Sequence, residues 1–350
     1  MAAEWKSKWR GCFRPRVMPD YVDRQEMGDD RILVGDVGGT HARFAIIDTS
    51  ERPFRVGQRT DLGTEKYGGF LQALKAYLHG MSERQPNAAA IAVAGPVADG
   101  RVYFTNSGWD VSEAGLRALG FARVLLINDF AALAFSISAL PGEAFHTIGP
   151  QLEGMLDQPI TIVGAGTGFG VSCLARYRGR AVPMATEGGH ISFAPRGDDQ
   201  IAVLQVLARR FGRVSIERVV SGPGLENIYA ALAEIAGRKS PPLAAEQISE
   251  AAEAGDVECR AAQDMFCSIY GAVAGDFALA HGARGGVYIA GGIAAKIEPY
   301  LQRSDFRAAF EDKGRLSHFV DPVPTKLIIE PNAAFLGAAY ASLEFCGEKR

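Results

Sequence analysis

The sequence predicts an α/β fold made of two related halves. From residue 31 onwards, short apolar runs typical of strands alternate with segments whose apolar residues recur at helical spacing. At Ile32 the chain begins a strand, which is followed by a turn of Gly and Thr and by a second strand. The same order of elements begins again at Ile160. Aligning Gly35 with Gly164 gives an offset of 129 residues (164 − 35), close to the size of one domain. We therefore expect a duplicated fold with one Gly/Thr turn in each half.

Length and composition fit a folded chain with a sizeable core. The 350 residues suggest two domains or one large one, and apolar residues make up 47%. Lys and Arg total 37 against 40 Asp and Glu, so the net charge of −3 gives no overall attraction for nucleic acid. The five cysteines form no C-x-x-C pair, which argues against a zinc site and is typical of a reducing cytoplasm. No apolar run reaches transmembrane length and no signal peptide precedes the first strand, so we expect a cytoplasmic protein without nucleic-acid or membrane partners.

Residues 1–30 differ from the rest of the chain. Aromatic residues recur there at helical spacing among Lys and Arg, a pattern that would suit a helix on a membrane surface. Gly11 and Pro15 would break such a helix, and the charges then turn acidic. We predict instead a disordered extension, or a start codon placed too far upstream.

The first half carries strands, two helical segments and one buried strand. Phe70, Leu71, Leu74, Tyr77 and Leu78 lie at helical spacing. A continuous apolar run ends in Asn128-Asp129, which indicates a strand buried on both faces of a sheet. The expected strands are 31–37, 42–48, 89–94, 101–105 and 124–127, and a helix is expected over 130–140.

The second half repeats the opening arrangement. A strand over 160–163 leads into the Gly/Thr turn and a second strand over 171–174, and a third element of this kind spans 286–293. The remaining expected elements are a helix over 225–235, a surface loop with a short helix over 239–256, and an apolar-faced helix over 332–345.

The first Gly/Thr turn, Gly35 to Thr40, places Asp36 at the end of a strand. Glycines let backbone N–H groups approach a bulky anion, a hydroxyl adds a hydrogen bond, and an acid nearby can hold hydrated Mg²⁺. The pattern indicates a metal-bound polyphosphate, although an ordinary Gly-Gly hairpin has the same residues.

The second turn, Gly164 to Gly170, does not fit a dinucleotide-binding fold. Its spacing is G-x-G-x-G-x-G rather than G-x-G-x-x-G, and a strand follows where a helix should. The Walker motif and the protein-kinase signatures are also absent.

Polar residues elsewhere allow both functional and structural interpretations. Asp129 follows a buried strand, where it can take a proton from a hydroxyl or simply cap the next helix. Glu187 and His190 flank two glycines, which favours a loop that contacts sugar hydroxyls over a helical metal pair. Glu217 suits an ion pair on a helix surface, and the turn that begins at Ser221 either contacts a nucleoside or only turns the chain.

Taken together and in this order, these segments resemble the bacterial glucokinase family of the hexokinase, actin and heat-shock ATPase superfamily. The resemblance covers about residues 31–345. The segments that carry it are Gly35-Asp36-Val37-Gly38-Gly39-Thr40, Ala94-Gly95-Pro96-Val97, Thr105-Asn106, Ile127-Asn128-Asp129-Phe130, Gly164-Ala165-Gly166-Thr167-Gly168, Glu187-Gly188-Gly189-His190, Ser221-Gly222-Pro223-Gly224-Leu225, Ala290-Gly291-Gly292-Ile293 and Phe310-Glu311-Asp312-Lys313-Gly314-Arg315.

The resemblance implies a two-domain actin-like (ribonuclease H-like) ATPase fold with sugar in the interdomain cleft. It implies that Asp129 is the general base on the glucose 6-hydroxyl, with Mg²⁺ held near Asp36 through water and no direct protein ligand. The implied sugar contacts are Asn128, Asp129, Glu187, His190 and Glu217. The implied ATP contacts are Gly35, Asp36, Val37, Gly38, Gly39, Thr40, Gly166, Thr167 and Gly168.

The expected activity is ATP-dependent phosphorylation of glucose, the first step of glycolysis, by a homodimer. We place a small domain at residues 31–139 plus 330–350 and a large domain at 140–329. A kinase for another hexose and a non-catalytic sugar sensor on the same fold remain alternatives. The sensor would need a DNA-binding domain, which residues 1–30 are too short to form.

Two departures from the family pattern stand out. His41 occupies a position where the family often has Asn, so the edge of the phosphate turn differs. No cysteine lies between Cys173 and Cys259, which argues against the related repressor and kinase group with its cysteine-rich zinc motif.

Overall fold

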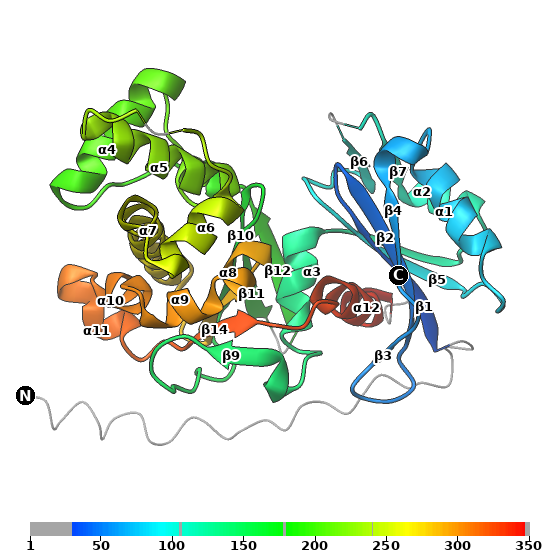
Figure 1. Ribbon diagram of the computed structural model, residues 1–350. Coiled ribbons are helices and arrows are strands. Elements are labelled where there is room, and N and C mark those ends of the chain that lie inside the picture. Colours follow the sequence, from blue (N-terminus) through cyan, green and yellow to red (C-terminus); the bar gives the residue numbers. More distant parts are fainter. Residues whose placement is uncertain (1–29, 105–106, 178–179, 240, 347–350) are drawn as a thin grey trace, which may run out of the picture.

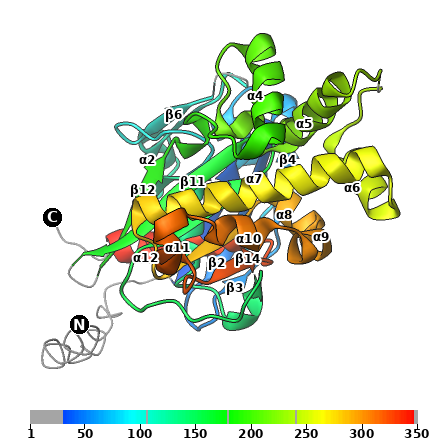
Figure 2. The ribbon, with the colours of Figure 1, turned by 90° about the vertical axis from the view of Figure 1, so that its left-hand side faces the viewer.

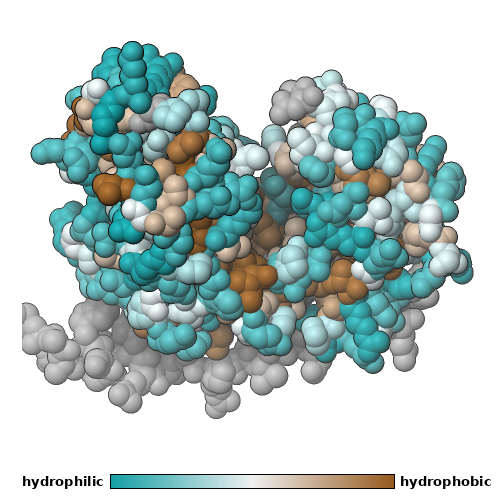
Figure 3. Space-filling model, viewed as in Figure 1, coloured by the Kyte–Doolittle hydropathy of each residue, from teal (hydrophilic) through white to brown (hydrophobic). Residues whose placement is uncertain are grey.

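Two lobes, each built around a mixed sheet, make up the molecule (Figure 1). The computed structural model describes residues 30–104, 107–177, 180–239 and 241–346. The predictions for residues 1–29 and for Thr105-Asn106 lie outside these ranges. Figure 3 shows the surface hollowed between the two lobes, as a two-domain fold with a cleft requires.

The small lobe contains the first six-stranded sheet, in the order β3-β2-β1-β5-β8 with β4 also paired to β2. Strands β1, β5 and β8 run parallel, so their carboxyl ends meet at one edge. Helices α1 and α2 cover the outer face. The bounds are β1 (Arg31–Val37), β2 (His41–Asp48), β3 (Arg55–Val56), β4 (Thr60–Gly63), β5 (Ala88–Val93), β8 (Arg123–Asn128), α1 (Phe70–His79), α2 (Glu113–Ala118) and the hairpin of β6 (Arg101–Tyr103) and β7 (Asp110–Ser112).

The large lobe contains the second six-stranded sheet, in the order β12-β11-β10-β13-β14-β9. Its β10–β11 hairpin repeats the antiparallel β1–β2 hairpin, and β13 then pairs parallel to β10 as β5 pairs to β1. The predicted duplication is therefore confirmed. The strands are β9 (Phe145–Thr147), β10 (Ile160–Ala165), β11 (Phe169–Tyr177), β12 (Arg180–Thr186), β13 (Gly286–Ala290) and β14 (Thr325–Ile328).

Helices of the large lobe cover the face of its sheet that lies away from the small lobe, and α7 is the longest of those described (Figure 2). The expectation of a strand after the turn at 286–293 is wrong, because a helix, α8, follows β13 and starts the crossover that parallel strands need. The bounds are α4 (Gly197–Phe211), α5 (Gly222–Ile235), α6 (Ala245–Ala254), α7 (Val257–His281), α8 (Gly292–Lys296), α9 (Glu298–Arg303), α10 (Phe306–Glu311) and α11 (Ser317–Val320).

Two helices, α3 (Asp129–Ser136) and α12 (Ala333–Cys346), lie between the sheets (Figure 1). A shared apolar core joins them to both sheets, with Val34 and Ala90 from the small sheet and Ile162 and Leu174 from the large one. Both helices were predicted, although α3 ends one turn earlier than expected. Because this core links the lobes, a change at α3 is transmitted to either sheet.

Short 3₁₀ helices complete the described chain, at Thr64–Lys66, Gly142–Ala144, Gly188–His190, Ile216–Arg218 and Gly314–Leu316. None of the helices in the described ranges combines the length and the apolarity that crossing a membrane requires.

Candidate active site

The carboxyl ends of the parallel strands in the small sheet bring distant polar residues together. Val37 is opposite Val93 in the sheet, and Val93 is opposite Asn128. The backbone N–H of Ala94 donates to the carbonyl of Val37 (3.0 Å), and the Asn128 amide donates to the carbonyl of Gly95 (3.2 Å). The first Gly/Thr turn and Asn128 therefore lie at the same edge of the sheet.

Asn128, rather than Asp129, caps the helix that follows. Its side chain accepts a hydrogen bond from the backbone N–H of Ala131 (3.1 Å). Asp129 is the first residue of α3, and its carboxylate accepts from the backbone N–H of Phe130 (2.9 Å). None of the described Lys, Arg or His side chains forms an ion pair with it. Capping of α3 is thus the role of Asn128, and within the described ranges the carboxylate of Asp129 has no cationic partner.

The Asp129 carboxyl titrates near neutral pH. Its pKa is raised from the usual value near 3.8 to about 7, mainly by burial and to a smaller extent by the negative charges of Asp36 and Glu187, against the lowering effect of the hydrogen bond from the N–H of Phe130. Those two carboxylates influence Asp129 because they lie near it, one from each lobe. A carboxylate whose pKa is close to 7 is suited to accept a proton at physiological pH.

The first Gly/Thr turn is closed by its own backbone, since the N–H of Gly38 donates to the carbonyl of His41 (2.9 Å). His41 also lies on the turn through its Nδ1, which is 3.0 Å from the Thr40 hydroxyl oxygen. His41, the residue that departs from the family pattern, therefore contacts the Thr40 hydroxyl, which was predicted to bind phosphate. Asp36 stands next to this turn with 25% of its side chain exposed.

Arg43, on β2 beside this turn, was not predicted as part of the site. It faces Asp36 across the β1–β2 hairpin, and its Nη1 donates to Asp36 Oδ2 (2.8 Å). Its Nε lies 3.6 Å from Oδ2 of Asp61, which is opposite Arg43 on the paired strand β4. Hairpin geometry could have found it, because the turn lies midway between positions 36 and 43.

A metal ion would not be enclosed by protein side chains at this edge. Across the described ranges, no group of three or more His, Cys, Asp and Glu residues is placed to hold one. Asp36 is nevertheless suitable for hydrated Mg²⁺, which usually keeps several waters and takes one or two carboxylates. One Asp36 oxygen is bonded to Arg43, and the carboxylate is partly exposed.

The second Gly/Thr turn lies at the edge of the large sheet. The N–H of Gly166 donates to the carbonyl of Gly168 (2.8 Å), and the N–H of Gly222 donates to the carbonyl of Gly166 (2.8 Å). Glu217 accepts from the backbone N–H of Phe169 (3.0 Å). Glu217 is thus not an ion-pair partner on a helix surface, because it is bonded to the strand that follows this turn.

A cavity of about 940 Å³ opens beside the second turn. Gly166 and Thr167 form one end, and α5, α6, α8 and α9 form the walls. The segment from Ser221 contributes Gly222 and Pro223, which favours the predicted nucleoside contact over a plain turn.

The glycines of the second turn also explain how α3 reaches the large sheet. A side-chain carbon at Gly170 would lie 1.9 Å from the ring of Phe130, and one at Gly164 would lie 2.9 Å from it. The ring of Phe130 therefore packs directly on the β10–β11 hairpin. Because Phe130 is next to Asp129, this contact fixes Asp129 relative to the second turn.

Glu187 and His190 lie on the loop after β12, as predicted, in a short 3₁₀ turn. His190 Nε2 is 4.0 Å from Glu187 Oε2, and the two side chains are 60% and 64% exposed. The guanidinium of Arg213 donates to the carbonyl of His190 (2.6 Å). Both polar side chains remain open to a ligand.

Two related lobes with paired Gly/Thr turns, and a buried carboxylate at the start of α3 between their sheets, are the arrangement of an ATP-dependent sugar kinase of the actin-like fold. The glucokinase family model matches residues 33–344. Glucokinase from Caulobacter sp. strain K31 is 48% identical over 88% of this chain and 94% of its own, and that from Nitrobacter hamburgensis is 39% identical over 89% and 97%. The chain belongs to the glucokinase family and is an enzyme that phosphorylates glucose with ATP.

Solved structures agree with this fold. A glucokinase from an Antarctic psychrotroph has a TM-score of 0.82 at 36% identity, covering 89% of this chain and 98% of that one. A ROK family glucokinase from Streptomyces griseus, in complex with glucose and AMPPNP, has a TM-score of 0.60 at 19% identity, covering 88% of this chain and 98% of that one, which shows the fold alone. Nothing among these similarities favours a kinase for another hexose or a non-catalytic sensor.

Proposed function

We propose that Asp129 is the general base of the reaction. The observation that carries this proposal is a buried carboxyl at the start of α3, beside the contact of Phe130 with the second hairpin, whose pKa is raised to about 7 and which has no cationic partner among the described residues. Asp129 takes the proton of the glucose 6-hydroxyl as that oxygen attacks the γ-phosphorus of ATP and the bond to the β-phosphate oxygen breaks. ADP leaves, and glucose 6-phosphate forms.

We propose that the sugar is held by Asn128, Asp129, Glu187, His190 and Glu217. Carboxylates, an amide and an imidazole can pair with vicinal hydroxyls as acceptors and donors. Exposure of Glu187 and His190 supports this role, and so does the electrostatic effect of Glu187 on Asp129. Glu217 would contact sugar while its other oxygen stays bonded near the second turn.

We propose that Gly35 to Thr40 and Gly166 to Gly168 bind the phosphates of ATP from opposite lobes. The nucleoside would occupy the cavity of about 940 Å³ that begins at Gly166 and Thr167. Asp36 would hold a water of a Mg²⁺ ion bound with the nucleotide, and the ion would supply charge neutralisation for the phosphates.

The domain boundaries remain a prediction, with residues 31–139 plus 330–350 in the small domain and 140–329 in the large one. We also propose a homodimer, which the exposed side chains of Val182 and Met184 on the edge strand β12 support. Free, buried thiols at Cys173, Cys259 and Cys267 support a cytoplasmic location, and the proposed role in glycolysis rests on the phosphorylation of glucose.

The proposed base gives the reaction a pH dependence. Asp129 accepts a proton only when it is ionised, and its pKa in the folded chain is about 7. We therefore expect kcat/KM for glucose to fall as the pH drops through 7, by about tenfold for each unit below 6. Initial rates between pH 5.5 and 8.5 measure this, and a flat profile over that range would contradict the assignment.

Glu187→Gln tests the sugar site separately from the nucleotide site. Loss of a charged acceptor should weaken glucose binding by roughly tenfold to a hundredfold, while AMPPNP binding stays the same. Calorimetric titration of each ligand measures the two effects. The matched control is Glu143→Gln, an exposed carboxylate on another 3₁₀ helix. If glucose binds Glu187→Gln as tightly as it binds the control, Glu187 is not a sugar contact.

A further inference from the structure

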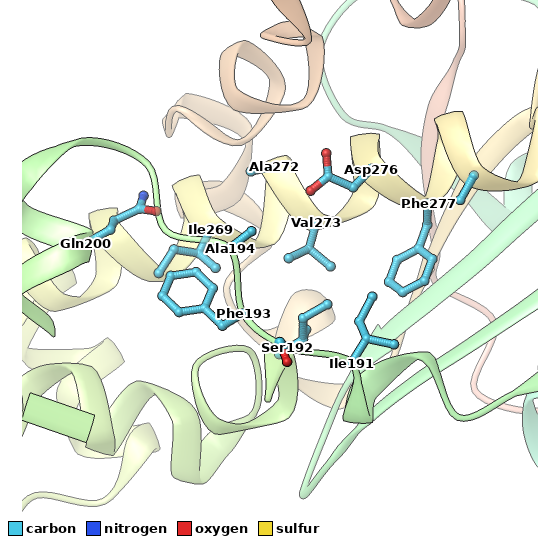
Figure 4. A pocket seen from close by; sticks show the side chains of 12 residues that line it. Ile191, Ser192, Phe193, Ala194, Gln200, Ile269, Ala272, Val273, Asp276 and Phe277 are labelled. Atoms are coloured by element: carbon cyan, nitrogen blue, oxygen red, sulfur yellow. The ribbon is translucent and has the colours of Figure 1, made fainter. Parts of the chain in front are cut away.

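A second, smaller cavity lies behind the proposed sugar loop. Its volume is about 200 Å³, and it separates the segment 191–194 from α7 (Figure 4). It shares no lining residue with the cavity beside the second Gly/Thr turn. None of the proposed sugar or nucleotide contacts lines it.

The walls of this cavity are mainly apolar. Val273 and Phe277 extend from α7 towards Ile191 and Phe193 on the facing segment (Figure 4). An apolar space of about 150 Å³ in a protein can hold a benzene molecule. The cavity is therefore large enough for a molecule with one ring.

One buried polar side chain at this cavity has an unused donor. Gln200 is 8% exposed, and its Oε1 accepts from the backbone N–H of Arg196 (2.9 Å). Its Nε2 has no hydrogen-bond partner among the described residues. Because Gln200 lines the cavity and this donor is unpaired, a hydrogen-bond acceptor on a ligand could pair with it.

The single carboxylate at the cavity is already paired. Lys313, whose side chain is 6% exposed, lies 2.7 Å from Asp276 Oδ1 and donates to the carbonyl of Ala272 (2.8 Å). Lys313 belongs to the Phe310-Glu311-Asp312-Lys313-Gly314-Arg315 segment, to which the proposed reaction assigns no role. Because Asp276 is neutralised by Lys313, a charged ligand gains little here.

The cavity wall continues directly into the proposed sugar loop. Ile191 follows His190, and Ile216 precedes Glu217; the N–H of Ile216 donates to the carbonyl of Ile191 (2.9 Å). A side-chain carbon at Gly188 would lie 2.8 Å from the ring of Phe277, so this ring supports the glycine between Glu187 and His190. Phe277 thus lines the cavity on one side and contacts the sugar loop on the other, so an occupant that packs against this ring also supports the loop.

We propose that this cavity binds a small, uncharged, mainly apolar molecule with one hydrogen-bond acceptor, and that its occupancy strengthens glucose binding. The acceptor pairs with the Gln200 amide, and the apolar body fills the space beneath Phe277. The effect on glucose rests on the proposed sugar roles of His190 and Glu217, whereas the binding itself does not.

Acetophenone and α-methylstyrene are matched probes, because they differ in a carbonyl and a CH₂ group. Chemical shifts of isoleucine methyl groups in the full-length protein report binding through Ile191, Ile216 and Ile269. We expect acetophenone to bind roughly threefold to tenfold more tightly than its isostere. Saturating glucose should lower the Kd of acetophenone by roughly fivefold, and saturating acetophenone should lower the Kd of glucose, measured by calorimetry, by the same factor.

Two variants separate the parts of the proposal. Gln200→Met should abolish the preference for acetophenone, and Ala280→Leu, at the exposed rim on α7, should weaken both probes. The absence of methyl shifts up to the solubility limit overturns the site, and equal affinity for the two probes overturns the role of Gln200. An acetophenone Kd that glucose leaves unchanged overturns the coupling. Failure of Glu187→Gln to weaken glucose would contradict the proposed sugar site and leave the probe titration standing.

Discussion

Asp129→Asn is expected to lower kcat by about a hundredfold or more while glucose still binds. The amide keeps the size of the side chain and its place at the start of α3, but it cannot accept a proton from the 6-hydroxyl at neutral pH. The two turns and the other four proposed sugar contacts stay intact, so the variant should retain ground-state binding. ADP release measured with glucose gives kcat, and calorimetry gives the Kd for glucose.

Stability distinguishes loss of the base from loss of the fold. The pKa of Asp129 is raised on folding, so the ionised carboxylate opposes folding increasingly as the pH rises from about 4 to about 7, and by a constant amount above that. Asp129→Asn removes this penalty and should unfold at a higher temperature than the parent at pH 8, with a smaller gain at pH 4.5. The control is Asp99→Asn. Asp99 is exposed, and its backbone φ of 50° is one that Asn also adopts readily. Turnover near that of the control would rule out Asp129 as the base.

The sequence predicted the parts of the fold that local pattern determines. The hairpin around Asp36 and its repeat at Gly164 were found because apolar runs and glycine turns are signals of a few neighbouring residues. The edge position of Asp129 followed from a single buried run. The structure confirms all three placements.

Helices α4 and α7 were not predicted. The buried Val203, Val206 and Leu207 of α4 lie at helical spacing, so its pattern was present in the sequence, whereas the packing of α7 obscures its pattern. Ala and Gly residues on α7 are buried on several sides, so its apolar positions do not form one stripe of helical period. The contact of Phe130 with Gly170 and the bond of Glu217 to the N–H of Phe169 join residues 40 or more positions apart. No local pattern contains such contacts, and they depend on how α3 and the second turn pack together.

Asp36→Ala is expected to weaken Mg·ATP binding by roughly tenfold to a hundredfold while glucose binding is unchanged, because a carboxylate that holds metal-bound water orients the metal's hydration shell. Titration with Mg·AMPPNP measures affinity without turnover, and the Mg²⁺ dependence of the rate measures use of the metal. Removing Asp36 also leaves Arg43 with only its longer contact to Asp61, so more of its charge could act on the phosphates. A phosphate attraction from Arg43 would offset part of the loss, so Asp36→Asn is the second variant, because its amide oxygen still accepts from Arg43.

Asp61→Asn is the matched control for the Asp36 variants. Asp61 also lies beside Arg43, at 3.6 Å, but on β4 and away from the Gly38-Gly39 turn. If the carboxylate of Asp36 acts on the metal, both Asp36 variants lose Mg·AMPPNP affinity and Asp61→Asn does not. Equal losses in all three would mean that the network around Arg43 merely shapes the turn. Unchanged Mg²⁺ dependence in Asp36→Ala would exclude Asp36 from the metal side, and the water-mediated site would then have to be built from the nucleotide alone.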